Sequence, residues 1–395
     1  MDIKLVLKNH WIKVSLLIIC ISIAISVLWY RGYIMAYGRG DFTGYWSAEY
    51  LFRNGRNPYN PQAMLEVQRD VIQSDFDFVM MAWNPPSLFI FLLPVGGLPF
   101  DIASATWFSA NILFVVVACF LLAKTYFPEK TILLLVFCLL AILFPPVLSA
   151  IMTGQVTFLV LLGLSASLFF IRRQQFFGAG ISLLLVTVKP HLVILPVVYL
   201  VLIFFRRDYR KGLLGLLTGG MFCITLLFLF RPSWLLDFWG LLNMAPINWL
   251  TPTLGGLLSY LRITEAGRYL IFLWFPFVFY LSRQTQLEIT VIIPFLVLLT
   301  VPFTFFGWSY DQSILLIPIA QIFGWLAGSQ QTLYRVGITL LIVVLVMLNY
   351  VHRVLCPDEL YYLWVPIAWG FIYGLTWWFL KKNENPSNIP TVIST

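Results

Sequence analysis

Long runs of apolar residues follow one another along almost the whole chain, and short clusters of arginine and lysine separate them. A run of about 20 apolar residues is long enough to cross a bilayer as a helix. The pattern therefore predicts an all-α polytopic membrane protein, a bundle of about twelve transmembrane helices. The predicted spans are residues 14–30, 102–123, 131–149, 156–171, 174–189, 191–205, 212–230, 266–281, 287–306, 312–328, 334–350 and 362–380.

One further apolar run, 85–98, is short and is interrupted by Pro94, Gly96 and Gly97. If it does not cross and the amino terminus is cytoplasmic, the later basic clusters face the cytoplasm, as the positive-inside rule requires. If it crossed, all of these clusters would face outward. We therefore expect this run to be re-entrant or interfacial.

The resulting topology places both termini in the cytoplasm. Residues 1–382 then form a single transmembrane domain, and 383–395 form a polar cytoplasmic tail. Within the domain, 31–101 is a long first outer loop, in which we expect juxtamembrane helices. The absence of a small-residue cleavage site after the first apolar run favours a retained anchor helix over a cleaved signal peptide.

Composition supports this topology and excludes several classes of protein. The chain is 60% hydrophobic and 11% charged, whereas a soluble domain has roughly 25% charged residues. The basic residues behind the net charge of +8 lie at the ends of apolar runs, so membrane topology explains them. We therefore expect no nucleic-acid partner. The five cysteines lack metal-site spacing, and no nucleotide-binding motif is present. We expect neither a metal nor a cofactor.

Several polar and ionisable residues, scattered through the sequence, fall on the outer side of this topology. Such groups are costly at membrane depth and usually mark a substrate site or a relay. The residues are Asp41, Glu49, Gln155, Lys189, His191 and Asp311. We therefore interpret them as a candidate site at the outer face.

Asp41 follows the first apolar run in the stretch GRGDFTGYW. A carboxylate there can remove a proton from a hydroxyl as that hydroxyl attacks, which sugar transfer requires. The alternative is that Asp41 is the N-cap of a juxtamembrane helix.

The segment NGRNPYNP continues the first outer loop and supplies Arg53, Arg56 and Tyr59 nearby. These residues are suited to hold an anionic head group or a sugar, or else the loop simply lies on lipid phosphates. The acids of SDFDF, residues 74–78, have the spacing of a cation site, but a solvated loop explains them better.

Lys189 is the only lysine that the topology places outside, and Pro190 joins it to His191. A lysine at membrane depth suits the neutralisation of a lipid-linked phosphate, and the histidine is suited to donate a hydrogen bond to the same group. The alternative is that Lys189 extends to the outer head groups. Gln155 offers a neutral hydrogen-bonding group at the outer face. We expect Asp311 either to bind substrate or to cap a helix.

Four segments in sequence order carry a resemblance to a known family. They are DFTGYWSAEYLFRNGRNPYNP, WNPPSLFIFLLPVGGLP, MTGQVTFLVLLGL and GAGISLLLVTVKPHLVILP. Together they resemble the polytopic membrane glycosyltransferases of family 87 in the GT-C superfamily, which are polyprenol-phosphate-mannose-dependent mannosyltransferase-like proteins. Related sequences often carry histidine where this chain has SYDQ around Asp311.

The resemblance implies a function and assigns roles. It places Asp41 at the position of the catalytic base and NPPSLF on the membrane after the first loop. The implied enzyme moves a monosaccharide, mannose or another hexose, from a polyprenyl-phosphate donor to a glycolipid or glycan acceptor. The reaction would occur with inversion at the outer face of a cytoplasmic membrane, among membrane lipids. The residue arguments above, rather than the resemblance, add the other roles, in which Lys189, His191, Arg53 and Arg56 would bind the donor phosphate and Glu49, Tyr59, Gln155 and Asp311 would bind substrate.

Two other classes of protein remain as alternatives. A flippase or transporter of lipid-linked sugars predicts polar residues at the midplane and broken helices in paired halves, whereas here the polar groups gather at one face. An accessory membrane subunit would leave the outer polar residues unexplained.

Overall fold

The computed structural model describes residues 40–73, 77–244, 249–284, 288–356 and 358–383. These residues form helices and, within the described ranges, no strands. The predicted first span, 14–30, lies outside them. The chain divides into two compact units. Unit one contains the chain up to Val117, Ile151–Val156 and Leu226–Asn243, and unit two contains Ala118–Ala150, Thr157–Thr225 and the chain from Met244.

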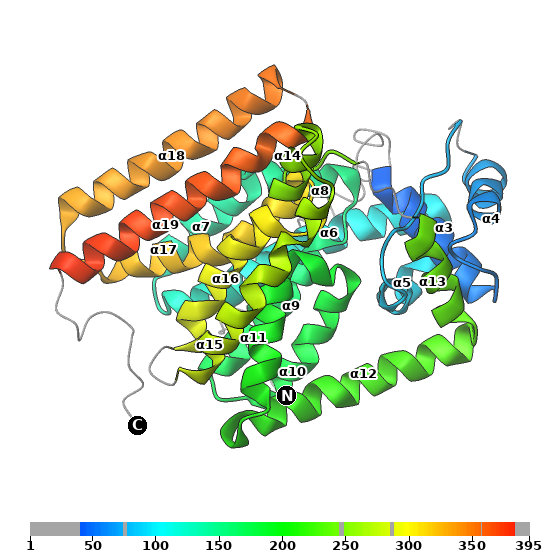
Figure 1. Cartoon of the computed structure of the whole chain (residues 1–395), viewed down its shortest axis with the longest axis horizontal. Coiled ribbons are helices and arrows are strands. Elements are labelled where there is room, and N and C mark those ends of the chain that lie inside the picture. The colour runs from blue at the N-terminus through cyan, green and yellow to red at the C-terminus, as the bar shows by residue number, and fades with distance from the viewer. Residues whose placement is uncertain (1–39, 74–76, 245–248, 285–287, 357, 384–395) are drawn as a thin grey trace, which may run out of the picture. The chain divides into compact units, whose positions relative to one another are not determined.

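Unit one is built around the first outer loop. Short helices predominate in it, and α3, α4, α5 and α13 gather together in Figure 1. Its elements are α3 (Gly40–Arg53), α4 (Pro61–Glu66), a π-helical turn η1 (Val67–Val71), α5 (Ser87–Gly96), the first part of α6 (Phe100–Tyr126), the end of α12 (Arg210–Phe230) and α13 (Trp234–Met244). The region predicted as the first outer loop therefore contains the short helices α3, α4 and α5, and their juxtamembrane position stays a prediction.

Unit two contains most of the longer apolar helices, interrupted by 3-10 turns. Its α-helices are α7 (Thr131–Leu143), α8 (Pro145–Thr153, which ends in unit one), α9 (Thr157–Arg172), α10 (Phe176–Ser182), α11 (Ile194–Phe204), α14 (Leu254–Tyr260), α15 (Phe275–Arg283), α16 (Ile289–Phe303), α17 (Leu316–Gly328), α18 (Thr332–Leu355) and α19 (Trp364–Asn383). Its 3-10 helices are η2 (Leu183–Val188), η3 (Pro190–Val193), η4 (Arg207–Tyr209), η5 (Ala266–Trp274), η6 (Ser309–Leu315) and η7 (Glu359–Leu363).

Four helical segments of the described chain are long and apolar enough to cross a membrane, and a fifth appears if the bent pair α7 and α8 is one span. The four are Phe100–Tyr126, Arg207–Phe230, Thr332–Leu355 and Glu359–Lys382. The twelve-span count is not confirmed and stays a prediction, because several other apolar helices have only 10–17 residues. Among these, α5 has 10 residues and a length of about 15 Å, half of a hydrocarbon core of about 30 Å.

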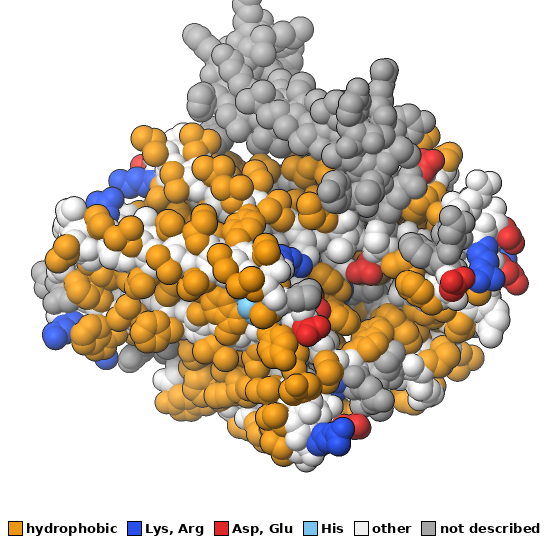
Figure 2. Space-filling view, turned by 90° about the horizontal axis from the view of Figure 1, so that it is seen from above, with side chains coloured by type: hydrophobic (Ala, Val, Ile, Leu, Met, Phe, Trp, Pro, Cys, Tyr) orange, Lys and Arg blue, Asp and Glu red, His pale blue; other side chains and the backbone are white. Residues whose placement is uncertain are grey.

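Apolar side chains cover much of the outer surface of the long helices. On α18, Leu333, Leu340 and Val354 are 88%, 59% and 83% exposed. Figure 2 shows hydrophobic side chains over most of the described surface on the face in view. Such surfaces suit contact with lipid, and the all-helical backbone satisfies its own hydrogen bonds there. The structure therefore agrees with a membrane protein.

Within unit two, α12 packs closely on α10 through small residues. A Cβ atom on Gly180 would lie 1.9 Å from the carbonyl oxygen of Gly212, and one on Gly215 would lie 2.2 Å from that of Phe177. Small residues allow helix backbones to approach in this way, and membrane helices use them because packing replaces the hydrophobic effect there.

An ion pair within α3, between the half-buried Arg53 and the buried Glu49, lies against α5 in unit one. Arg53 Nη2 lies 2.9 Å from Glu49 Oε1, and it also donates to the carbonyl oxygen of Leu93. Glu49 is 0% exposed, and its Oε2 has no hydrogen-bond partner in the described part of the chain. A Cβ on Gly96 would lie 1.6 Å from that oxygen, and one on Gly97 would lie 2.3 Å from Arg53 Nη1. The two glycines thus make room for the ion pair.

Burial of Glu49 changes its acidity. Loss of water around the carboxylate raises the pKa of Glu49 to about 7, and the hydrogen bond and charge of Arg53 oppose this rise only in part. The folded protein therefore holds a proton on Glu49 over a pH range in which an unfolded chain, with a pKa of 4.5, would release it.

We expect Gly96→Ala to lower the stability of the protein by about 1–3 kcal/mol, because the added methyl group displaces the buried Glu49 carboxyl group. Thermal unfolding in detergent measures this. Gly240→Ala on α13 is the control, since nothing lies within 4 Å of its Cβ position, and it should be neutral or slightly stabilising. If Gly96→Ala destabilises a Glu49→Ala variant as much as it destabilises the wild type, the added methyl group clashes with some other part of the protein.

We expect the thermal stability of the wild type to fall as the pH rises from about 4.5 to about 7 and then to level off. Stability falls as the pH rises because the folded state binds the Glu49 proton more tightly than the unfolded state does. Glu49→Gln mimics the protonated acid, so its thermal stability should not show the pH-dependent decrease that Glu49 causes. Unfolding temperatures of both proteins across this range test the point, and parallel curves would contradict it.

Candidate functional site

Asp41 lies in the first turn of α3 in unit one, and its side chain is half-buried. The amide nitrogen of Gln155 donates a hydrogen bond to Asp41 Oδ2. The hydroxyl of Tyr45 donates to Gln155 Oε1 at 3.0 Å. Asp41, Tyr45 and Gln155 form what we call the Asp41 cluster. The structure therefore brings together two predicted site residues that are 114 positions apart in the chain.

A tight turn before Gln155 positions its side chain. Gly154 has a φ of +71°, a left-handed conformation that glycine adopts without strain. Its carbonyl oxygen accepts a 2.9 Å hydrogen bond from Trp107 Nε1 on α6. A Cβ on Gly40 would lie 3.1 Å from the carbonyl oxygen of Thr153, so α3 begins in close contact with this turn. These contacts place the amide of Gln155 beside the Asp41 carboxylate.

Asp41 lies inside the first turn of α3, which begins at Gly40, and not before the helix as an N-cap does. A negative charge in the first turn is favoured by the partial positive charge of the helix N-terminus. The ionised form of a carboxylate is the form that accepts a proton.

The other predicted residues of the first loop contact protein groups. Arg53 binds Glu49, as described above. Arg56 forms an exposed 2.8 Å ion pair with Glu66. Tyr59 is 1% exposed, and its hydroxyl donates to the carbonyl oxygen of Asn84 at 2.8 Å. The substrate contacts expected of these residues stay predictions. Of the SDFDF acids, Asp75 lies outside the described residues.

Lys189 and Asp311 form a buried ion pair in unit two. Lys189 Nζ lies 2.9 Å from Asp311 Oδ1, and the two residues are 7% and 3% exposed. The hydroxyl of Thr157 donates to the same carboxylate oxygen. We call these three residues the Lys189 cluster. A buried pair is tolerated only when further hydrogen bonds satisfy its charges, and Thr157 provides one.

The position of Lys189 follows from Pro190. The helical conformation is disfavoured for a residue before proline, and Lys189 has a φ of −148° and a ψ of 64°. It therefore ends η2, and η3 begins at Pro190. The break directs the ammonium group toward η6, where it also lies 5.1 Å from the ring centroid of Tyr310.

Asp311 is both a local cap and an ion-pair partner. It is the third residue of η6, and its Oδ2 accepts the backbone N–H of Trp308, which precedes the helix, at 3.1 Å. Its other oxygen binds Lys189. His191 lies near enough to both charges to interact with them electrostatically, and its carbonyl oxygen accepts a 2.8 Å hydrogen bond from Thr304. Lys189, His191 and Asp311 are thus gathered in one place.

The sequence analysis missed two residues that hold these segments. Thr157 was missed, although it lies only two positions after Gln155. Glu359 was also missed, and its carboxylate accepts hydrogen bonds from the backbone N–H of Ser309 at 2.7 Å and from its hydroxyl at 2.9 Å. Glu359 begins η7 and lies three residues before the last predicted span, 362–380, so its position was an available signal.

Comparison with known proteins supplies the family. The sequence model of glycosyltransferase family 87 matches residues 83–281, half of the chain, and this region contains Gln155, Lys189 and His191. No curated protein and no solved structure matches the chain. The chain therefore belongs to glycosyltransferase family 87, and it is a glycosyltransferase built from apolar, membrane-compatible helices.

Proposed function

We propose that this glycosyltransferase moves one hexose, mannose or a close relative, from a polyprenyl-phosphate donor to a hydroxyl group of a glycolipid or glycan. The observation that carries the proposal is the Asp41 cluster, in which a half-exposed carboxylate at the start of α3 is oriented by a buried amide. Its predicted place beside the first span suits an acceptor that arrives from the outer side of a cytoplasmic membrane.

The proposed reaction is a single displacement with inversion. The Asp41 carboxylate accepts the proton of the acceptor hydroxyl while that oxygen forms a bond to the anomeric carbon of the donor sugar. The bond between the anomeric carbon and the phosphate oxygen breaks, and its electron pair leaves with the polyprenyl phosphate. Gln155 donates to Asp41 Oδ2 and so fixes the orientation of the base.

We assign the leaving phosphate to Lys189. An ammonium group has three N–H donors, so it is able to bind Asp311 and a phosphate oxygen together. His191 is the neighbouring group suited to donate a hydrogen bond to the same phosphate. Because Asp311 offsets the charge of Lys189, the attraction for an anion is weaker than that of an isolated lysine.

We expect Asp41→Asn to reduce sugar transfer by about 10²–10⁴-fold while leaving thermal stability nearly unchanged. The amide keeps the size of the side chain but cannot act as a base. Asp101→Asn, an exposed acid in the first turn of α6, is the matched control and should retain activity. Transfer of radiolabelled sugar by purified protein in nanodiscs measures both, and near-wild-type turnover of Asp41→Asn would refute the assignment.

We expect Lys189→Met to destabilise the protein by about 3–5 kcal/mol, because it leaves the Asp311 carboxylate buried and unpaired. The double variant Lys189→Met/Asp311→Leu removes both charges and should recover most of that stability. If Lys189 binds the donor phosphate, the double variant should still bind donor more than about tenfold more weakly than wild type.

Titration of a polyprenyl-phosphate sugar in nanodiscs separates these effects. Lys130→Met, which removes an exposed lysine of the same unit, is the control and should bind donor normally. Wild-type donor binding by the double variant would show that Lys189 only pairs with Asp311 and that other groups hold the phosphate.

A further inference from the structure

Glu359 is a half-buried acid of η7 to which the proposed reaction gives no role. Both of its carboxylate oxygens bind the same residue. Oε2 accepts the backbone N–H of Ser309 at 2.7 Å, and Oε1 accepts the hydroxyl of Ser309 at 2.9 Å. Hydrogen bonds to a charged group are stronger than neutral ones, and two of them fix the direction of a contact as well as its length. Ser309 is buried and begins η6, so Glu359 fixes the start of that helix.

A second hydrogen bond joins the same two helices. The amide nitrogen of Gln312 on η6 donates to the carbonyl oxygen of Tyr362 on η7 at 3.0 Å. Residues three positions apart lie directly above each other on a 3-10 helix. Ser309 and Gln312 therefore share one face of η6, and that face binds η7. Two contacts one turn apart hold η6 against rotation about its axis.

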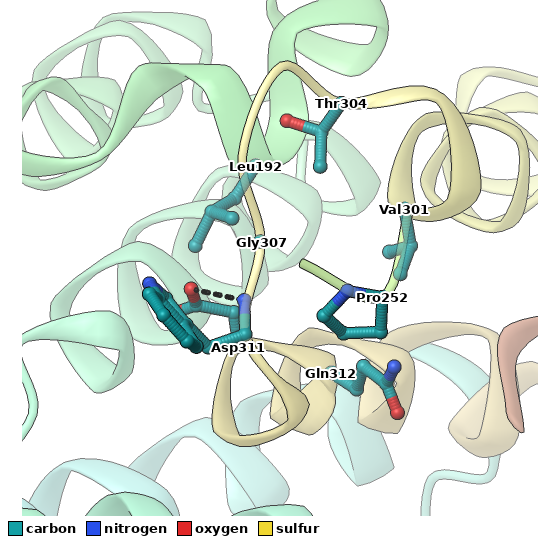
Figure 3. Close-up of a pocket in the computed structure, with 8 residues that line it drawn as sticks. Leu192, Pro252, Val301, Thr304, Gly307, Asp311 and Gln312 are labelled. Atoms are coloured by element: carbon teal, nitrogen blue, oxygen red, sulfur yellow. Dashed lines mark hydrogen bonds between the residues drawn. The ribbon is translucent and has the colours of Figure 1, made fainter. Parts of the chain in front are cut away.

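Asp311 lies on a different face of η6. It precedes Gln312 by one residue, which is about 120° around a 3-10 helix. Its Oδ1 lies 2.9 Å from Lys189 Nζ, and its Oδ2 accepts the N–H of Trp308, a bond that Figure 3 draws as a dashed line. The contact with η7 therefore sets the direction in which η6 presents Asp311. A buried ammonium group is costly to separate from its counterion, so the same contact sets the place of the Lys189 ammonium.

Glu359 is itself held by its surroundings. Arg353, near the end of α18, lies close enough to attract it electrostatically. The Arg353 guanidinium donates to the hydroxyl of Ser149 on α8 at 2.8 Å, and it lies 5.4 Å from the ring centroid of Tyr362. A path of contacts within unit two therefore runs from α8 and α18 through η7 and η6 to Lys189.

The chain that enters η6 is fixed independently of Glu359. Arg268 on η5 is 4% exposed. Its guanidinium donates to the carbonyl oxygen of Trp249 at 2.6 Å and to that of Phe305 at 3.2 Å. Phe305 lies shortly before Ser309 in the chain. Loss of the Glu359 contact should therefore release η6 locally and leave the segment before it in place.

We propose that Glu359 is a positioning residue for the donor: it holds η6 so that Asp311 keeps the Lys189 ammonium where the donor phosphate binds. The inference rests on the proposed function, in which Lys189 binds that phosphate. A purely electrostatic role predicts the opposite effect. A negative charge near the site repels a phosphate, so neutralising Glu359 would then strengthen donor binding. The sign of the change separates the two roles.

The test titrates variants in nanodiscs with undecaprenyl-phosphate mannose and with undecaprenyl phosphate. Glu359→Gln removes the charge at constant size, whereas Glu359→Asp keeps the charge but shortens the side chain by one methylene group. Ser309→Ala removes only the hydroxyl that Oε1 binds, and it serves if the Glu359 variants do not fold. Glu129→Gln, which changes an exposed acid of the same unit, is the matched control.

Both Glu359 variants should bind each probe about tenfold more weakly than the wild type, and Ser309→Ala about threefold more weakly. The two probes should lose affinity equally, because both carry the phosphate, and Glu129→Gln should bind them normally. A mere loss of folded protein would lower the number of binding sites and leave the Kd unchanged. The proposal is overturned by unchanged or tighter binding in Glu359→Gln, or by a loss confined to the sugar-bearing probe.

The Lys189→Met/Asp311→Leu background tests the route of the effect. If Glu359 acts through the ion pair, Glu359→Gln should weaken donor binding no further in this background, because coupled residues are not additive. A full additional loss would overturn the proposal. Normal donor binding by the background itself would refute the assignment of the phosphate to Lys189, and this route with it. A weakened background together with normal binding by Glu359→Gln would refute the role of Glu359 alone.

Discussion

The ion pair between Lys189 and Asp311 is the interaction on which the arrangement of unit two most depends. Each charge is buried and would be costly to leave alone, so the segments that carry them must meet. The break between η2 and η3 supplies the lysine, η6 supplies the aspartate, and the start of α9 supplies Thr157. One electrostatic requirement therefore brings the break at Lys189, η6 and the start of α9 together.

The helical character of the chain follows from its apolar runs, but the lengths of the helices do not. The positions of apolar runs predicted spans at 174–189 and 191–205, where the structure has α10 with η2 and η3 with α11. An apolar run looks the same in sequence whether it forms one long helix or a short helix joined to a 3-10 turn. Prolines and close packing against neighbours decide between these outcomes. The non-helical break at Lys189 was predictable, because Pro190 enforces it.

The candidate site was predictable where membrane topology marks a residue as unusual. Lys189 was found in this way because it is the only lysine that the predicted topology places outside, and Asp41 was found because it follows the first predicted span. The pairing of Lys189 with Asp311 was not found, because residues 122 positions apart leave no local pattern. Thr157 looks like an ordinary polar residue at the start of an apolar helix. Its importance comes from its burial and from its hydrogen bond to Asp311, which only three-dimensional contacts define.

Arg268 binds main-chain oxygens of Trp249 and Phe305 rather than their side chains. Every residue type carries a carbonyl group, so a substitution at Trp249 or Phe305 keeps the acceptor of this contact, whereas a substitution of Arg268 by an apolar residue removes its donor. Its carbonyl partners are also uncharged and its guanidinium is buried, so added salt should screen the contact far less than it screens the exposed ion pair of Arg56 and Glu66.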